Sequence, residues 1–131
     1  MIDTSALVAA LVFDHEHHVV ARSHLRADAR IPAIVLCETY AQLRRTFRQP
    51  AAKALALLRT WQQRPDLVLD TSPEATVRVL GRAVELDLGG NIHDALVAQV
   101  CLDHGVGMVT LDRRQHTIAL AIGTSSTYLL A

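Results

Sequence analysis

Residues 89–98 read Gly89-Gly90-Asn91-Ile92-His93-Asp94-Ala95-Leu96-Val97-Ala98. The two glycines free the backbone for a tight turn, and the apolar run after them is typical of a helix. Asn91 is a good N-cap, because its side-chain oxygen can accept an N–H of the first helical turn. Asp94 then falls in that turn, where a carboxylate suits the helix dipole. Asp94 is either a structural residue of this helix start or one of several carboxylates that converge on a metal ion.

The length and composition predict one cytoplasmic domain over residues 1–131. Half of the residues are hydrophobic but only 4% are aromatic, so a core of Ala, Val, Leu and Ile is expected. Cys37 and Cys101 do not resemble a disulfide framework, and two such thiols are typical of a reducing cytosol. The longest apolar run, Ala6–Phe13, is far shorter than the roughly 20 residues of a membrane span. No membrane contact is therefore expected.

The charges balance overall but are segregated along the chain. Residues 39–65 carry six bases and no acid, whereas residues 66–112 carry eight acids and two bases. Such segregation can produce a basic surface for phosphates beside an acidic pocket. Ordinary solvated helix faces are an equally good explanation of the same pattern.

Periodicity and breakers predict short strands separated by helices. Strands or extended pieces are expected at Ala29–Pro32, Leu67–Leu69, Val106–Thr110 and Thr127–Leu130. Helices are expected at Ser5–Phe13, from Val19, at Ile34–Phe47 and Ala51–Gln63, from Pro73, and from Asp94 to about His104, with a turn at Asp112–Arg114. This alternation predicts parallel pairing and an α/β fold.

Three helices carry more specific expectations. The Ser5–Phe13 helix is apolar all round, so it is either buried or covered by a partner. The Ala51–Gln63 helix is expected to bury a stripe of Ala54, Leu57, Leu58 and Trp61. The helix from Pro73 has a stripe of Val77, Leu80 and Val84.

Four acids occupy positions that are expected to meet. Asp3 and Asp112 follow strands, and open parallel sheets bind ligands at the carboxyl ends of their strands. Asp94 begins a helix that can lie at the same edge, and Glu38 sits in an apolar setting where a carboxylate needs a partner. Four such groups repel one another unless a cation neutralises them. Because Lys53 is the only lysine and the donors are all oxygens, Mg²⁺ or Mn²⁺ is the expected cation.

Four motifs in this order resemble those of the PIN-domain nucleases, and most of all the VapC toxins of bacterial toxin–antitoxin pairs. They are Met1-Ile2-Asp3-Thr4-Ser5-Ala6-Leu7, Cys37-Glu38-Thr39, His93-Asp94-Ala95 and Thr110-Leu111-Asp112-Arg113. None is specific alone, but together they span nearly the whole chain. The resemblance implies a single PIN-like domain, in which a short parallel sheet is flanked by helices as an α/β/α sandwich.

The resemblance also implies an activity. Asp3, Glu38, Asp94 and Asp112 would hold Mg²⁺ or Mn²⁺ for hydrolytic cleavage of RNA, usually transfer RNA or another structured RNA, leaving 5′-phosphate and 3′-hydroxyl ends. Thr110 would orient water or phosphate, and Arg44 is a weaker candidate for a phosphate contact. A VapB-type antitoxin and a second copy in a homodimer are the implied partners.

One departure keeps an alternative open. Many relatives carry a further acid two positions after the fourth, where this chain has Arg114. A PIN-like module that binds RNA or an antitoxin without cutting is therefore the alternative. A phosphoacceptor domain is disfavoured, because no lysine follows Lys53 and Ser5 stands where a dehalogenase-type site has its second Asp.

The remaining candidates favour structural roles. His15, His17 and His18 lack the spacing of a zinc motif and are typical of a solvated turn. His93 is expected to be partly buried at its helix start, and Cys37 to be a small core residue.

Overall fold

The β-strands are very short, and all of them pair in parallel. In the computed structural model, which describes residues 1–131, the strands are β1 (Ile31–Pro32), β2 (Val68–Leu69), β3 (Met108–Thr110) and β4 (Ser126–Tyr128). β1 pairs with β2, β3 pairs with β4, and Ile2 forms an isolated parallel bridge to Val109. The predicted parallel α/β architecture is confirmed, although the strands form two separate pairs instead of one sheet.

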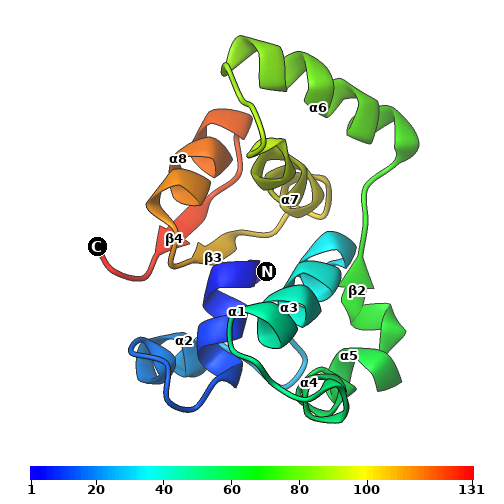
Figure 1. Ribbon diagram of the computed structural model, residues 1–131. Coiled ribbons are helices and arrows are strands. Elements are labelled where there is room, and N and C mark those ends of the chain that lie inside the picture. The colour runs from blue at the N-terminus through cyan, green and yellow to red at the C-terminus, as the bar shows by residue number, and fades with distance from the viewer.

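Helices cover both sides of β3 and β4. Their bounds are α1 (Thr4–Leu11), α2 (His18–Ser23), α3 (Ala33–Arg45), α4 (Ala51–Leu57), α5 (Arg59–Gln63), α6 (Pro73–Glu85), α7 (Ile92–Asp103) and α8 (Arg113–Ile122), with a 3-10 turn, η1, at Pro65–Leu67. α7 and α8 lie on one side of this strand pair, and α1 and α3 lie on the other (Figure 1). No helix combines the length and the hydrophobicity that a membrane-spanning segment requires.

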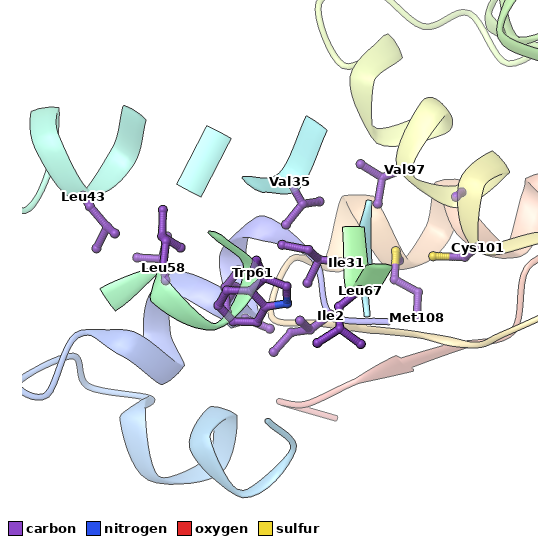
Figure 2. Close-up of a cluster of buried hydrophobic side chains, with 14 of the residues drawn as sticks. Ile2, Ile31, Val35, Leu43, Leu58, Trp61, Leu67, Val97, Cys101 and Met108 are labelled. Atoms are coloured by element: carbon purple, nitrogen blue, oxygen red, sulfur yellow. The ribbon is translucent and has the colours of Figure 1, made fainter. Parts of the chain in front are cut away.

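The core is aliphatic, as the composition predicts. Its largest fully buried side chains include Leu7 from α1, Leu43 from α3 and Met108 from β3. Figure 2 shows Leu43 and Met108 among the other core side chains. Burying each of these contributes about 1.5–3 kcal/mol. Trp61 is the one tryptophan, and its indole N–H donates to the Ala29 carbonyl at 2.8 Å, so its polar atom is satisfied inside the core.

α1 is buried within the chain itself. Asp3 precedes it as the N-cap, and every residue from Ala6 to Ala10 is buried. Of the two explanations for its all-apolar sequence, burial is correct for Ala6 to Ala10, whereas Phe13, which the prediction placed in this helix, lies beyond its end and is 88% exposed. Ile2, the residue before Asp3, pairs with Val109 in a parallel bridge. Asp3 therefore lies where this extended segment ends and α1 begins.

One predicted helix and one predicted stripe need correction. The predicted helix Ala51–Gln63 is two helices that meet at Leu58, where the backbone leaves helical geometry. Its predicted stripe is nevertheless confirmed, because Ala54, Leu58 and Trp61 are buried and Leu57 is half-buried. On α6 the predicted stripe of Val77, Leu80 and Val84 faces solvent. A second, narrower stripe of Ala75, Val79 and Ala83 is buried instead, because its small side chains let α6 approach α7 closely.

The predicted turn at Asp112–Arg114 is the start of a helix. Asp112 caps α8 by accepting from the Arg114 and Gln115 N–H groups at 2.8 and 3.3 Å. The predicted apolar piece Ile118–Ile122 is the second half of the same helix. An N-cap aspartate is a recognised helix signal, and the charged residues that follow it obscure that signal here.

Candidate active site

Asp3 is held rigidly at the junction of α1 and β3. It is 4% exposed, and its Oδ1 accepts from the Ala6 N–H at 2.9 Å. Ser5 Oγ donates to both carboxylate oxygens, at 2.9 and 3.1 Å, and Thr110 Oγ1 donates to Oδ2. Burial nevertheless outweighs these hydrogen bonds and raises the pKa of Asp3 to about 6. A charged carboxylate at this position is thus costly unless a cation lies beside it.

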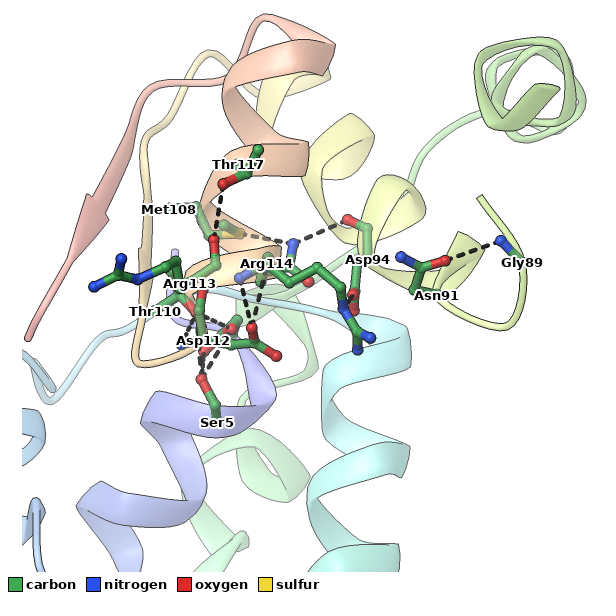
Figure 3. A network of polar contacts seen from close by, with 12 residues as sticks. Ser5, Gly89, Asn91, Asp94, Met108, Thr110, Asp112, Arg113, Arg114 and Thr117 are labelled. Carbon is green, nitrogen blue, oxygen red and sulfur yellow. Dashed lines mark hydrogen bonds and ion pairs between the residues drawn. The ribbon is translucent and has the colours of Figure 1, made fainter. Parts of the chain in front are cut away.

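Thr110 joins two of the acids. Its hydroxyl donates to Asp3 and accepts from the Asp112 N–H at 2.9 Å, and the residue is fully buried. Ser5 adds a second link, because its Oγ also accepts from the Leu111 N–H at 3.0 Å. The start of α1 and the chain after β3 are therefore locked together (Figure 3).

Removing the Thr110 hydroxyl is expected to destabilise the protein. Thr110→Val keeps the volume but leaves the half-buried Asp112 N–H without its acceptor and removes one of the donors to the Asp3 carboxylate, at a cost of about 1–3 kcal/mol. Thr110→Ser keeps the hydroxyl and should cost less. Urea unfolding of the two variants measures the difference, and an equal loss in both would show that the hydroxyl contributes nothing.

Asp94 lies in the first turn of α7, but its local structure differs from the prediction. Asn91 does not cap the helix with its side chain; its Oδ1 accepts from the Gly89 N–H at 3.0 Å instead. Gln115 of α8 fixes the helix start from outside, by donating from Nε2 to the Asp94 carbonyl at 2.9 Å. The Asp94 side chain is 23% exposed, and its buried Oδ2 has no hydrogen-bond partner.

Glu38 approaches from α3. The buried face of this helix consists of Val35, Thr39 and Leu43, and Glu38 lies half-buried beside it. Burial is the main reason why the pKa of Glu38 is raised, and the Asp94 carboxylate raises it further. The pKa of Asp94 is also raised by burial, against the lowering effect of Arg114.

One pocket of about 200 Å³ brings the four predicted acids together. Val97 is its only apolar residue and Arg114 its only base. The residues that line it are Asp3, Thr4, Ser5, Glu38, Gln42, Asp94, Val97, Asp112, Arg114 and Gln115. Ser5 and Gln115 position the acids but are not recognisable from the sequence, where a serine and a glutamine carry no distinctive pattern.

The donor set suits a divalent cation that prefers oxygen. The four acids in the pocket all present carboxylate oxygens. Asp3, Glu38 and Asp94 have raised pKa values. Asp94 Oδ2 is a buried acceptor that receives no hydrogen bond. A cation in the pocket would relieve each of these costs. The side chains do not place three such ligands around one point, so a cation held by all of them would require the side chains to move.

Arg44 is not part of this pocket. It lies exposed in the last turn of α3 and donates from Nη1 to the Gln49 carbonyl at 3.0 Å. A phosphate contact by Arg44 would therefore occur outside the acidic pocket, and it stays a prediction.

The structural roles predicted for the other candidates hold only in part. His15 and His17 lie in the turn before α2 and His18 begins that helix, but all three residues are half-buried and not fully solvated. Cys37 is exposed and not in the core, because it lies on the face of α3 opposite the buried one. His93 is exposed rather than partly buried.

Similarity to a known protein family extends over most of the chain. A protein-family model described as "PIN domain" matches residues 1–120, which include all four acids and both residues of the Thr110–Asp112 link. No curated protein matches the chain.

Proposed function

The chain belongs to the PIN-domain family, whose members are generally nucleases, and on this premise we propose that it is a Mg²⁺- or Mn²⁺-dependent endoribonuclease. Its proposed role is that of a VapC-type toxin held in check by a VapB-type antitoxin. The substrate is proposed to be transfer RNA or another structured RNA. The observation that carries the proposal is the convergence of Asp3, Glu38, Asp94 and Asp112 on one polar pocket.

Each acid has a distinct part in the proposed site. Asp3, locked by Ser5 and Thr110, is a fixed ligand, whereas Glu38 and Asp94 are ligands that approach from separate helices. Asp112 contributes through the oxygen that the α8 cap leaves free. A bound cation would activate water and stabilise the charge that develops on the phosphate. Asp94 Oδ2 accepts no hydrogen bond from the protein, so it is an acceptor that can orient such a water.

The basic segment 39–65 supports an RNA substrate. Its six bases, Arg44, Arg45, Arg48, Lys53, Arg59 and Arg64, are all exposed. Arg64 is paired with Asp66, with N–O distances of 2.7 and 2.9 Å, which leaves the other five for phosphates. Binding through them should weaken steeply with salt.

Metal dependence of cleavage tests the proposal directly. We expect the EDTA-treated protein to leave a mixed transfer RNA pool intact, and to cut it after Mg²⁺ or Mn²⁺ is added. The alternative is a module that binds without cutting, and the pairing of Arg114 with Asp94 favours it. Retained RNA binding with no cleavage at any metal concentration would establish the alternative.

An apolar groove between α3 and the α4–α5 pair supports the antitoxin. Leu36, Cys37 and Tyr40 line one wall, and Leu55, Leu58 and Gln62 line the other. Exposed bases such as Arg59 lie nearby in sequence, so the groove suits an acidic amphipathic helix. We expect Leu55→Glu to weaken antitoxin binding without affecting cleavage. Unchanged binding, measured by isothermal titration calorimetry, would place the antitoxin elsewhere.

The exposed stripe of α6 supports the proposed homodimer. Val77, Leu80 and Val84 lie on one face of this helix and are each more than half exposed. Solvent-facing apolar stripes of this kind mark protein contacts. Sedimentation of the wild type and of Leu80→Glu tests this: the wild type should sediment as a dimer and the variant as a monomer, and a monomeric wild type would contradict it.

A further inference from the structure

One cationic side chain faces the acidic pocket. Arg114 lies in the first turn of α8, and its Nε is 3.5 Å from Asp94 Oδ2. Its backbone N–H donates to Asp112 Oδ1 at 2.8 Å. A single residue therefore contacts two of the four acids, one through its charge and the other through its main chain (Figure 3).

The pair between Arg114 and Asp94 is loose. At 3.5 Å it meets the distance of an ion pair, yet Asp94 Oδ2 still has no hydrogen bond. The Arg114 side chain is 64% exposed, so it can turn away into water without disturbing α8. Such partly exposed pairs are weak and readily displaced.

The neighbouring arginine shows that the direction of Arg114 is specific. The guanidinium of Arg113 lies over the ring of Tyr128, 5.5 Å from its centroid, and Arg113 does not line the pocket. Successive helical residues point in different directions, so the phase of α8 alone sends one arginine to the pocket and the other to β4. Arg113 carries the same charge in the same helical turn, which makes it a matched control.

We infer that Arg114 is a built-in counter-cation that competes with the divalent metal for Asp94. In the metal-free protein it partly neutralises that carboxylate, and it is released into solvent when the metal binds. This inference rests on the proposed function, since it takes the pocket to be a metal site. Its consequence is a nuclease that needs a higher metal concentration than the four acids alone would require.

Metal binding to charge variants provides the test. Titration calorimetry with Mn²⁺ at pH 7.5 is performed on the EDTA-treated full chain as wild type, Arg114→Gln, Arg114→Lys, Arg113→Gln and Asp94→Asn. We expect Arg114→Gln to bind Mn²⁺ about three- to tenfold more tightly than the wild type. Arg114→Lys should stay within about twofold of the wild type because it keeps the charge, and Arg113→Gln should be unchanged.

Thermal unfolding adds a readout that does not depend on cleavage. Without metal, Arg114→Gln should melt at a lower temperature than the wild type, because Asp94 loses its counter-charge. With saturating Mn²⁺ the difference should shrink, since the metal replaces the arginine. Arg113→Gln should show no such metal-dependent recovery.

The outcomes distinguish the counter-cation role of Arg114 from the existence of the metal site itself. If the wild type binds Mn²⁺ but Arg114→Gln binds it no more tightly, or if Arg113→Gln tightens binding equally, the counter-cation role of Arg114 is wrong and the metal site stands. If the wild type does not bind Mn²⁺, or if Asp94→Asn binds it as well as the wild type, the proposed metal site is wrong as well.

Discussion

Replacing Asp94 by asparagine is expected to reduce Mg²⁺-dependent RNA cleavage by about 10³-fold, which corresponds to about 4 kcal/mol of transition-state stabilisation. The substitution keeps the size of the side chain but removes its charge, and it can turn the buried Oδ2, which accepts no hydrogen bond, into an N–H donor. Because the Asp94 carbonyl still accepts from Gln115, the start of α7 should remain folded.

The matched control for this variant is Asp103→Asn. Asp103 ends the same helix, is exposed and lies outside the pocket. It should cleave RNA like the wild type in a gel assay with a labelled substrate. Full activity in a correctly folded Asp94→Asn protein would contradict the role assigned to Asp94.

Replacing Asp3 by asparagine should abolish cleavage and at the same time stabilise the metal-free protein. The pKa of Asp3 rises from 3.8 to about 6 on folding, chiefly through burial. Between these values the folded state binds a proton that the unfolded state has released, so stability falls as the pH rises through this window. At neutral pH the charged carboxylate therefore costs about 3 kcal/mol. The side-chain oxygen of the asparagine would keep the cap on the Ala6 N–H without this cost.

Urea unfolding in EDTA at pH 4 and at pH 7.5 measures this effect. The gain in unfolding free energy from Asp3→Asn should be about 3 kcal/mol at pH 7.5 and should largely vanish at pH 4. Asp103→Asn should show no such pH-dependent gain. If Asp3→Asn lowers the unfolding free energy by the same amount at both pH values, the buried charge of Asp3 does not destabilise the folded protein.

The positions of Asp3 and Asp112 could be predicted because local rules determine them. Each follows a strand position and precedes a helix, and each accepts N–H groups at that helix start. Parallel strands bring such ends to one edge. The α/β class followed from the same alternation. Thr110 lies beside these acids because it ends the strand that precedes Asp112, but the hydroxyl bridge that it forms depends on the packing of α1 against β3.

Several missed features depend on which face of a helix turns inward. Leu80 and Val79 both fit an apolar stripe of α6, and only the close contact with α7 selects Val79. Cys37 follows an apolar run, yet the phase of α3 places it outside. The direction of Arg114 toward Asp94 has the same origin. Helix phase is set by tertiary contacts, which the sequence alone does not supply.

The chemistry of the cut ends tests the central claim most directly. Attack on the phosphorus by a water molecule, which a bound metal would activate, expels the 3′-oxygen and leaves a 5′-phosphate, whereas attack by the ribose 2′-hydroxyl leaves a 5′-hydroxyl. Ligation-based sequencing captures only 5′-phosphate ends unless the RNA is first phosphorylated, so it distinguishes the two. We predict discrete 5′-phosphate ends that appear only when the EDTA-treated wild type receives Mg²⁺ or Mn²⁺. Cleavage that persists in EDTA, or that yields 5′-hydroxyl ends, would contradict the account.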